Sequence, residues 1–235
     1  MLKHAIIIDN VVKTYKSGKI IALNNISLKI PKGIIYGIIG KNGAGKSTLI
    51  KCITGLIKPD SGSLKIYGKN AGEIKNLMGY IPEVCTIYDF MTGMDFLETI
   101  ADLRGISHKE MNCKLHEMKQ YIDFPDMNLL ASSYSKGNFE KLIFLSAFLH
   151  NPDVAILDEP FTGFDPAATL KAKEYIKNYT QSGKTVILST HILELAAQIC
   201  NNVAIINKGT LLIEHKFNQF ESLEAKLNIL KEVFE

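Results

Sequence analysis

One nine-residue stretch, Gly40 to Thr48, constrains the fold of this chain more than any other feature of its sequence. It fits the pattern G-x-x-x-x-G-K-[ST], follows the apolar run from Ile34 to Ile39 and precedes a helical pattern that ends at Gly55. A strand, a glycine-rich loop and a helix in this order are the context that a phosphate-binding loop requires. The sequence therefore predicts an α/β protein that binds a nucleoside triphosphate.

The residue types of this loop have the chemistry that polyphosphate binding needs. Its glycines let the backbone close around phosphates, and successive N–H groups point inward at the positive end of the following helix. Lys46 is expected to reach the β- and γ-phosphates, Ser47 to bind Mg²⁺, and Thr48 to add a hydroxyl contact. The predicted nucleotide-binding residues are Gly40, Lys41, Asn42, Gly43, Ala44, Gly45, Lys46, Ser47 and Thr48.

Composition excludes several classes of function. Of the 27 basic residues only Arg104 is an arginine, and the net charge is +3. An intrinsic arginine finger and bidentate reading of guanine are therefore not expected, and neither is a nucleic-acid partner. The four cysteines are scattered without a C-x-x-C, which predicts idle thiols in a reducing compartment. No apolar run is long enough to span a bilayer and no signal peptide is evident, so we expect an intracellular, soluble chain.

The hydrophobic periodicity predicts a layered α/β core interrupted by helices. Residues 5–30 have the alternation of β-structure, and all-apolar runs such as Val154 to Leu157 are typical of parallel strands. Further strands are expected at 186–189 and 203–207, with helices at 166–179 and 191–200. The expected units are a P-loop core with an antiparallel β region at 1–82 and 151–216, an inserted helical subdomain at 83–150, and a C-terminal helix at 217–235.

An acidic pair completes the predicted nucleotide site. Asp158 and Glu159 directly follow the strand from Val154 to Leu157, where side chains emerge at the ligand edge of a parallel sheet. Asp158 is expected to position Mg²⁺, and Glu159 to act as the general base that polarises the attacking water. Alone, the pair is weak evidence, because a solvated turn has the same residues. Together with the phosphate loop it predicts hydrolysis of the triphosphate.

With these motifs in place, the chain resembles the nucleotide-binding subunit of ATP-binding cassette (ABC) transporters over nearly its whole length. Residues 134–138 (Tyr-Ser-Lys-Gly-Asn) occupy the place of the LSGGQ signature, before a helix expected to begin at Phe139. Residues 158–160 match the Walker B end, 162–165 the D-loop, and 189–191 the switch histidine, here His191. Tyr15 lies where the family keeps an aromatic residue that stacks on adenine, although a tyrosine near a strand end is otherwise core or rim.

The resemblance implies a head-to-tail dimer, with a homodimer expected, in which each signature closes over the ATP of the partner. Ser135 and Gly137, at a helix N-terminus, would offer hydroxyl and N–H groups to that phosphate. It also implies ATP and Mg²⁺ as cofactors, a separate integral-membrane permease that docks near residues 83–105, and a location on the cytoplasmic face of the membrane. Read without the family, the same residues fit an ordinary N-capped helix.

Departures from the family pattern are expected to matter. Glu83 stands where the family usually has a glutamine that contacts the metal, and an ionised glutamate only accepts hydrogen bonds. Lys136 and Asn138 replace a glycine and a glutamine of the signature, whereas Ser135 and Gly137 are kept. This combination favours an exporter of the ABC-2 type.

Two other classes of protein remain open from the sequence. A non-transport ABC ATPase that acts on ribosomes or DNA usually carries two cassettes in one chain or long coiled coils, and neither pattern is present. A P-loop kinase or switch GTPase would leave residues 134–138 and 189–191 unexplained, and the guanine motif N-K-x-D is missing. Importer and exporter ATPases share all of these motifs.

Overall fold

A computed structural model describes residues 3–16, 18–70, 73–218 and 220–234. Its centre is a six-stranded sheet in the order β5-β6-β7-β3-β8-β9, in which β9 pairs antiparallel with β8 and the other neighbours are parallel. The parallel strands read as apolar runs because both of their faces are covered. Their bounds are β3 Ile35–Ile39, β5 Met78–Ile81, β6 Val154–Asp158, β7 Thr185–Thr190, β8 Asn202–Asn207 and β9 Thr210–Lys216.

A three-stranded antiparallel sheet in the order β2-β1-β4 forms the N-terminal layer, as predicted. It contains β1 His4–Tyr15, β2 Ile20–Pro31 and β4 Ser61–Ile66. Along β2 the buried side chains of Ile26, Leu28 and Ile30 alternate with exposed ones, because successive residues of a strand point to opposite faces. The fold is therefore an α/β P-loop cassette with an antiparallel β region.

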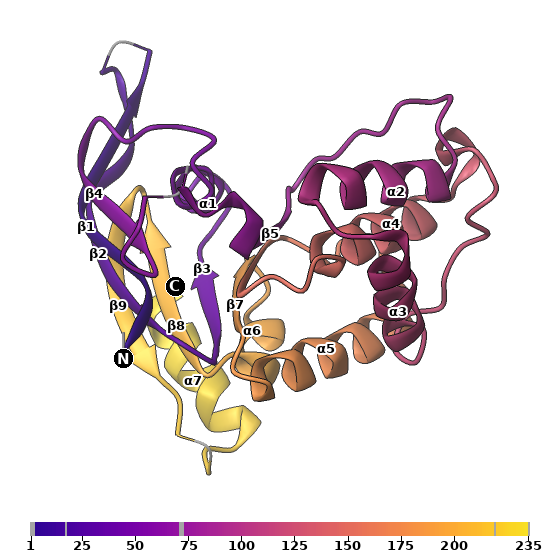
Figure 1. Cartoon of the computed structure of the whole chain (residues 1–235). Coiled ribbons are helices and arrows are strands. Elements are labelled where there is room, and N and C mark those ends of the chain that lie inside the picture. Colours follow the sequence, from indigo (N-terminus) through magenta and orange to yellow (C-terminus); the bar gives the residue numbers. More distant parts are fainter. Residues whose placement is uncertain (1–2, 17, 71–72, 219, 235) are drawn as a thin grey trace.

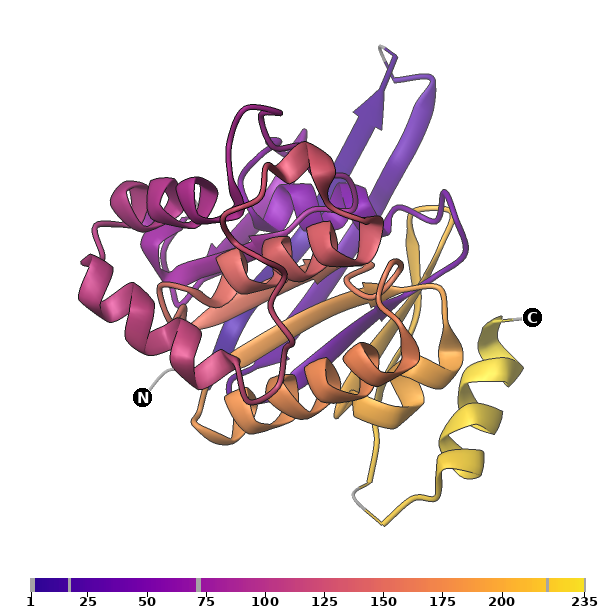
Figure 2. The ribbon, with the colours of Figure 1, turned by 90° about the vertical axis from the view of Figure 1, so that its right-hand side faces the viewer.

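The helices lie in groups around the central sheet. Figure 1 shows α2, α3 and α4 together on one side of the molecule and the antiparallel sheet on the other, with α1 between them. Figure 2 shows α5 along the central sheet and α7 at the edge. The bounds are α1 Lys46–Ile53, α2 Gly93–Arg104, α3 His108–Met118, α4 Lys136–Phe148, α5 Pro166–Gln181, α6 Leu193–Ile199 and α7 Leu223–Phe234, with 3₁₀ turns η2 Lys75–Leu77 and η3 Ala131–Ser133.

Each face of the central sheet has its own core. On one face Tyr36, Ile38 and Ile156 pack with α1 and the antiparallel sheet. On the other face side chains such as Leu157 and Leu188 pack with the helices. This second core includes methionines of the helical region, Met111 and Met118 among them.

Phe148 is a critical residue of that second core. It is 0 % exposed and contacts the rings of Phe144, Tyr175 and Tyr179 at centroid distances of 4.9, 5.1 and 5.0 Å. Phe148→Ala is expected to lower the free energy of unfolding by about 3–5 kcal/mol, since it removes these contacts and leaves a cavity. Urea denaturation measures this, with Phe220→Ala, at an 86 % exposed position, as the control. A loss below that of the control would contradict this packing.

Three elements differ from the sequence-based predictions. The strand β9 was not predicted; its residues alternate strictly between exposed and half-buried, and none of them is fully buried. Helix α4 begins at Lys136 rather than Phe139, since Ser135 caps it by accepting a hydrogen bond from the Asn138 amide. The C-terminal helix begins at Leu223 rather than near 217, and Ser222 caps it through the Ala225 amide.

Within the described residues, no helix is both long and apolar enough to cross a membrane. Residues 83–150 contain α2, α3 and α4, and their separation as a subdomain stays a prediction.

Candidate functional site

The phosphate loop connects β3 to α1 and has the backbone shape of an anion-binding nest. Gly45 has φ +108°, and a Cβ there would lie 2.5 Å from the Ala22 carbonyl oxygen, so only glycine fits. Gly43 has φ +78°, and a Cβ there would meet nothing within 4 Å. The loop is thus tightly packed on its protein side and open on its other side. That open side is where phosphates can approach the N–H groups.

Lys46 lies at the mouth of this loop with a buried side chain, 6 % exposed. Its ammonium donates to the carbonyl oxygens of Gly40 at 2.9 Å and Lys41 at 3.4 Å, and it lies 3.6 Å from the Glu159 carboxylate. Backbone carbonyls are weak partners for a full charge. The ammonium is therefore placed to exchange them for the oxygens of a polyphosphate.

A second group of oxygens gathers beside the loop, from three separate elements. The Ser47 hydroxyl donates to Glu83 Oε2 at 3.1 Å. Asp158, the last residue of β6, is 1 % exposed, and its Oδ1 accepts a hydrogen bond from the hydroxyl of Ser189 on β7. Its Oδ2 is buried and has no hydrogen-bond partner within the described chain.

These oxygens fit a magnesium ion. Burial raises the pKa of the Asp158 carboxyl by more than the hydroxyls of Ser189 and Ser47 lower it, and the negative charges of Glu83 and Glu159 add to the rise. A bound cation would supply the opposite charge that this buried carboxylate lacks. Hydroxyl and carboxylate oxygens are the ligands that Mg²⁺ prefers. Ser47, Asp158 and Glu83 are the side chains that could hold it next to the phosphates.

Glu159 follows β6 in a strained backbone conformation. Its φ is +50°, the left-handed region that non-glycine residues rarely adopt. Its amide donates to the backbone oxygen of Ser189 at 3.3 Å and to the Ser189 hydroxyl at 3.2 Å, which holds the turn. Its Oε1 lies 2.9 Å from His191 Nδ1 and 3.6 Å from the Lys46 ammonium. The turn thus aims the carboxylate at the open side of the phosphate loop.

The signature turn lies in the first turn of α4, on the surface. Ser135 and Lys136 are exposed, and Gly137 is half-buried. A Cβ on Gly137 would lie 3.0 Å from the carbonyl oxygen of Gly163, the residue just before Phe164 in the predicted D-loop. None of the hydrogen bonds described for residues 134–138 reaches the phosphate loop. The surface of this turn is free to contact another molecule.

Glu140 connects this turn to the predicted D-loop, a role that sequence reasoning missed. Its carboxylate accepts a hydrogen bond from the Gly163 amide at 2.5 Å, and Lys136 lies 3.9 Å from it. Lys141 lies 3.9 Å from Asp165, which caps α5. The first turn of α4 is therefore tied to the segment that directly follows Glu159. In the sequence, Glu140 is only an acidic residue near the start of a helix, so nothing there predicts its contact with Gly163.

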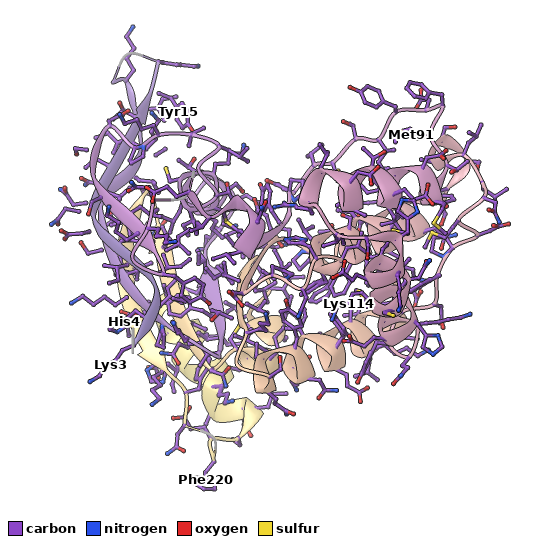
Figure 3. The ribbon with its side chains drawn as sticks, in the orientation of Figure 1. Lys3, His4, Tyr15, Met91, Lys114 and Phe220 are labelled. Carbon is purple, nitrogen blue, oxygen red and sulfur yellow. The ribbon has the colours of Figure 1, made fainter. Side chains whose placement is uncertain are left out.

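Of three further predicted residues, Tyr15 lies apart from the phosphate loop, and Thr48 and Asn42 belong to the predicted stretch. Tyr15 ends β1 opposite Ile20, is 39 % exposed and lies on the projecting hairpin at the upper left of Figure 3. Among the described residues, no hydrogen bond or ring contact joins it to the phosphate loop, so stacking on adenine stays a prediction. Thr48 lies half-buried in the first turn of α1, and Asn42 is exposed in the loop.

A cavity of about 310 Å³ lies beside these groups. Glu83 and Glu159 line one part of it, and Lys136, Phe139 and Glu140 of α4 line another. The residue that contacts Ser47 thus faces the same space as the start of the signature helix. A movement of Glu83 could therefore displace the start of α4, and the reverse.

The comparisons with known proteins agree with this geometry. The family model described as ABC transporter matches residues 23–162. An uncharacterized ABC transporter ATP-binding protein of Bacillus subtilis, YhaQ, is 34 % identical over 224 residues, covering 94 % of this chain and 74 % of the relative. A similar uncharacterized protein of Synechocystis is 33 % identical over 85 % of the chain, which spans only 59 % of that relative.

Solved structures give the same result. One described as the ATP-binding subunit of an ABC transporter superposes with a TM-score of 0.86 at 27 % identity, covering 97 % of this chain and 99 % of that one. A dimeric ATP-binding cassette in a post-hydrolysis state, bound to ADP and Pi, superposes with a TM-score of 0.82 at 24 % identity, covering 92 % of this chain and all of that one. The second likeness concerns the fold alone.

Proposed function

This chain belongs to the ABC transporter family, and from that premise we propose that it is the ATP-hydrolysing subunit that powers a separate membrane permease. Members of this family are ATPases that use ATP with Mg²⁺. The observation that carries the proposal is the convergence of Lys46, Ser47, Asp158, Glu159 and His191 at the carboxyl edge of β3, β6 and β7.

Each of these side chains has a role in the proposed hydrolysis of ATP. Lys46 binds the β- and γ-phosphates. Ser47, Asp158 and Glu83 would hold a magnesium ion, which would supply positive charge beside the phosphates. Glu159 accepts a proton from the attacking water as general base. His191, 2.9 Å from the Glu159 carboxylate, orients that carboxylate and can donate toward the γ-phosphate.

The site is completed by a second copy of the cassette. Ser135 is exposed, and within the described residues no hydrogen bond joins it or the N–H groups at the start of α4 to the phosphate loop of the same chain. At a helix N-terminus they are suited to bind an anion supplied by another subunit. A head-to-tail homodimer brings each signature turn over the phosphate loop of its partner. Those donors take the place of the arginine finger that this arginine-poor chain lacks.

The permease docks between α1 and α2. A cavity of about 520 Å³ lies there with exposed apolar side chains on its rim, Leu56 at 62 % and Leu103 at 75 %. Tyr88 and Phe90, stacked at 5.4 Å, are two more exposed aromatic side chains, before the other end of α2 and next to Met91 at the upper right of Figure 3. Lining the cavity are Thr54, Leu56, Asn76, Met78, Tyr80, Ile100, Leu103 and Arg104.

The charge of this region supports a membrane-protein partner. The segment from residue 83 to 103 has no lysine or arginine, and its acidic residues are Glu83, Asp89, Asp95, Glu98 and Asp102. Cytoplasmic loops of membrane proteins carry an excess of lysine and arginine. The cavity lining itself holds one charged residue, Arg104, and the acidic residues belong to the segment that leads into it along α2. This acidic segment is complementary to such a loop and repels anionic lipid. We therefore propose that the subunit lies on the cytoplasmic face, held by the permease; Glu83 and the signature residues are what support an exporter.

Extraction of the tagged protein from its native membranes in mild detergent tests this proposal. We expect one hydrophobic membrane protein to co-elute with the wild-type chain, and to be lost from a Leu56→Glu, Leu103→Glu variant. Both leucines are exposed, so the variant should keep its fold and its ATPase activity. Co-elution of ribosomes or nucleic acid, with no membrane protein, would overturn the transporter assignment.

Replacing Glu83 tests its contact with the metal site. Glu83→Gln removes a charged oxygen that lies 3.1 Å from Ser47. We expect the Mg²⁺ concentration for half-maximal ATPase activity to rise by about tenfold, the effect typical of lost partners around a metal. Glu98→Gln on the exposed face of α2 is the control, because it contacts only the imidazole of His108 in the described contacts. An unchanged rate and metal dependence would rule out this role for Glu83.

A further inference from the structure

The C-terminal helix α7 reaches the nucleotide face of the molecule. It packs against α6, the helix that follows His191, and its Leu230 is 0 % exposed in the shared core. Figure 2 shows α7 running alongside α6 toward the end marked C. Leu227, Val233 and Phe234 pack against the same core. The last described turn of α7 is therefore held in a defined place.

Phe234 makes a contact there with the phosphate loop. The ammonium of Lys41 lies 5.5 Å from the centroid of the Phe234 ring, within the range in which an ammonium is attracted to an aromatic face. Lys41 directly follows Gly40 in the phosphate loop and is exposed. A long exposed lysine would otherwise sample many rotamers. The ring restricts Lys41 to one side of the loop.

Lys41 is also joined to the buried lysine of the loop. Its carbonyl oxygen accepts a hydrogen bond from the Ala44 amide at 3.0 Å and lies 3.4 Å from the Lys46 ammonium, which donates to it. A continuous series of contacts therefore runs from Phe234 through Lys41 to Lys46. The Glu159 carboxylate, 3.6 Å from Lys46, lies at its other end.

From this series we propose that Phe234 is a positioning residue for ATP binding. By holding Lys41, its ring keeps the carbonyl oxygens of residues 40 and 41 where they orient the Lys46 ammonium toward the incoming phosphates. The contact acts on the loop before the nucleotide is bound, so it changes ATP affinity rather than the chemical step. It gives α7 a function in this reaction beyond covering the core.

The test is the kinetics of Phe234→Leu in the isolated full chain, without any permease. Leucine keeps the apolar contact with the core and removes the ring. We expect the KM for ATP to rise about two- to fivefold with kcat unchanged, the effect of one exposed cation–π contact. Phe234→Tyr, which keeps an aromatic face, should restore the wild-type KM.

A double-mutant cycle with Lys41→Met separates this role from general packing. If Phe234 acts through the lysine ammonium, Phe234→Leu should add no further rise in KM to the Lys41→Met protein. Thermal unfolding of all four proteins reports the packing effect of residue 234 in both backgrounds. An equal rise in KM with and without Lys41, or no rise at all, would overturn the proposal. The outcome is independent of whether a permease binds.

Discussion

Replacing Glu159 with glutamine is expected to lower kcat for ATP hydrolysis by about 10²–10⁴-fold, the usual contribution of a general base. The amide cannot accept the proton of the attacking water, while its oxygen still reaches His191, 2.9 Å away in the wild type. The phosphate loop and the Asp158 carboxylate are unchanged. ATP should therefore bind normally and remain intact.

Because Glu159→Gln should accumulate with ATP bound, its oligomeric state gives a second measurement. With hydrolysis blocked, the ATP-bound cassettes should remain paired, so that Glu159→Gln elutes as a dimer in MgATP and as a monomer without nucleotide. Single-turnover hydrolysis and size-exclusion chromatography measure the two effects. Glu174→Gln is the matched control, because Glu174 is exposed on α5. Rapid hydrolysis by Glu159→Gln would show that Glu159 is not the general base. A variant that stays a monomer in MgATP would contradict dimer closure by ATP.

The central site could be predicted from sequence because each of its motifs directly follows a strand. Parallel strands end at the same edge of a sheet, so residues after β3, β6 and β7 meet there without any knowledge of the strand order. The contacts of Lys46 with Glu159 and of Glu159 with His191 agree with this expectation. Glu83 contacts Ser47, and its predicted role at the metal stays a prediction.

The supporting contacts could not be predicted, because they depend on the arrangement of side chains in space. Ser189 holds both the Asp158 carboxylate and the Glu159 amide, yet in sequence it is only part of a strand end. The left-handed conformation of Glu159 has no sequence signal, since glutamate does not favour it. The contact between Phe234 and Lys41 joins residues that are far apart in the sequence. Periodicity predicts that α7 is amphipathic, but not what its end will touch.

Replacing Ser135 with aspartate is expected to have the second large effect on ATPase activity, and it provides one of the two proteins for a mixing experiment. Ser135→Asp keeps the cap of α4, because aspartate caps helices as well as serine does. It places a carboxylate where the partner's γ-phosphate is expected, and we expect ATPase activity to fall by about 10²-fold, as for loss of a main oxyanion donor. Ser135→Asn also caps the helix and also lacks the hydroxyl, but adds no charge, so as the control it should retain more activity than Ser135→Asp. Lys46→Ala should be inactive for a separate reason, loss of the phosphate contact.

Mixing the two inactive proteins, Ser135→Asp and Lys46→Ala, distinguishes a shared site from a site within one chain. In a head-to-tail dimer of the two, one site combines the intact phosphate loop of the first with the intact signature turn of the second. Random pairing should restore about a quarter of the wild-type rate, because about half of the dimers are mixed and each has one working site of two. If the mixture shows only the sum of the two separate rates, each chain hydrolyses ATP alone. The exposed turn at Ser135 would then need a different partner.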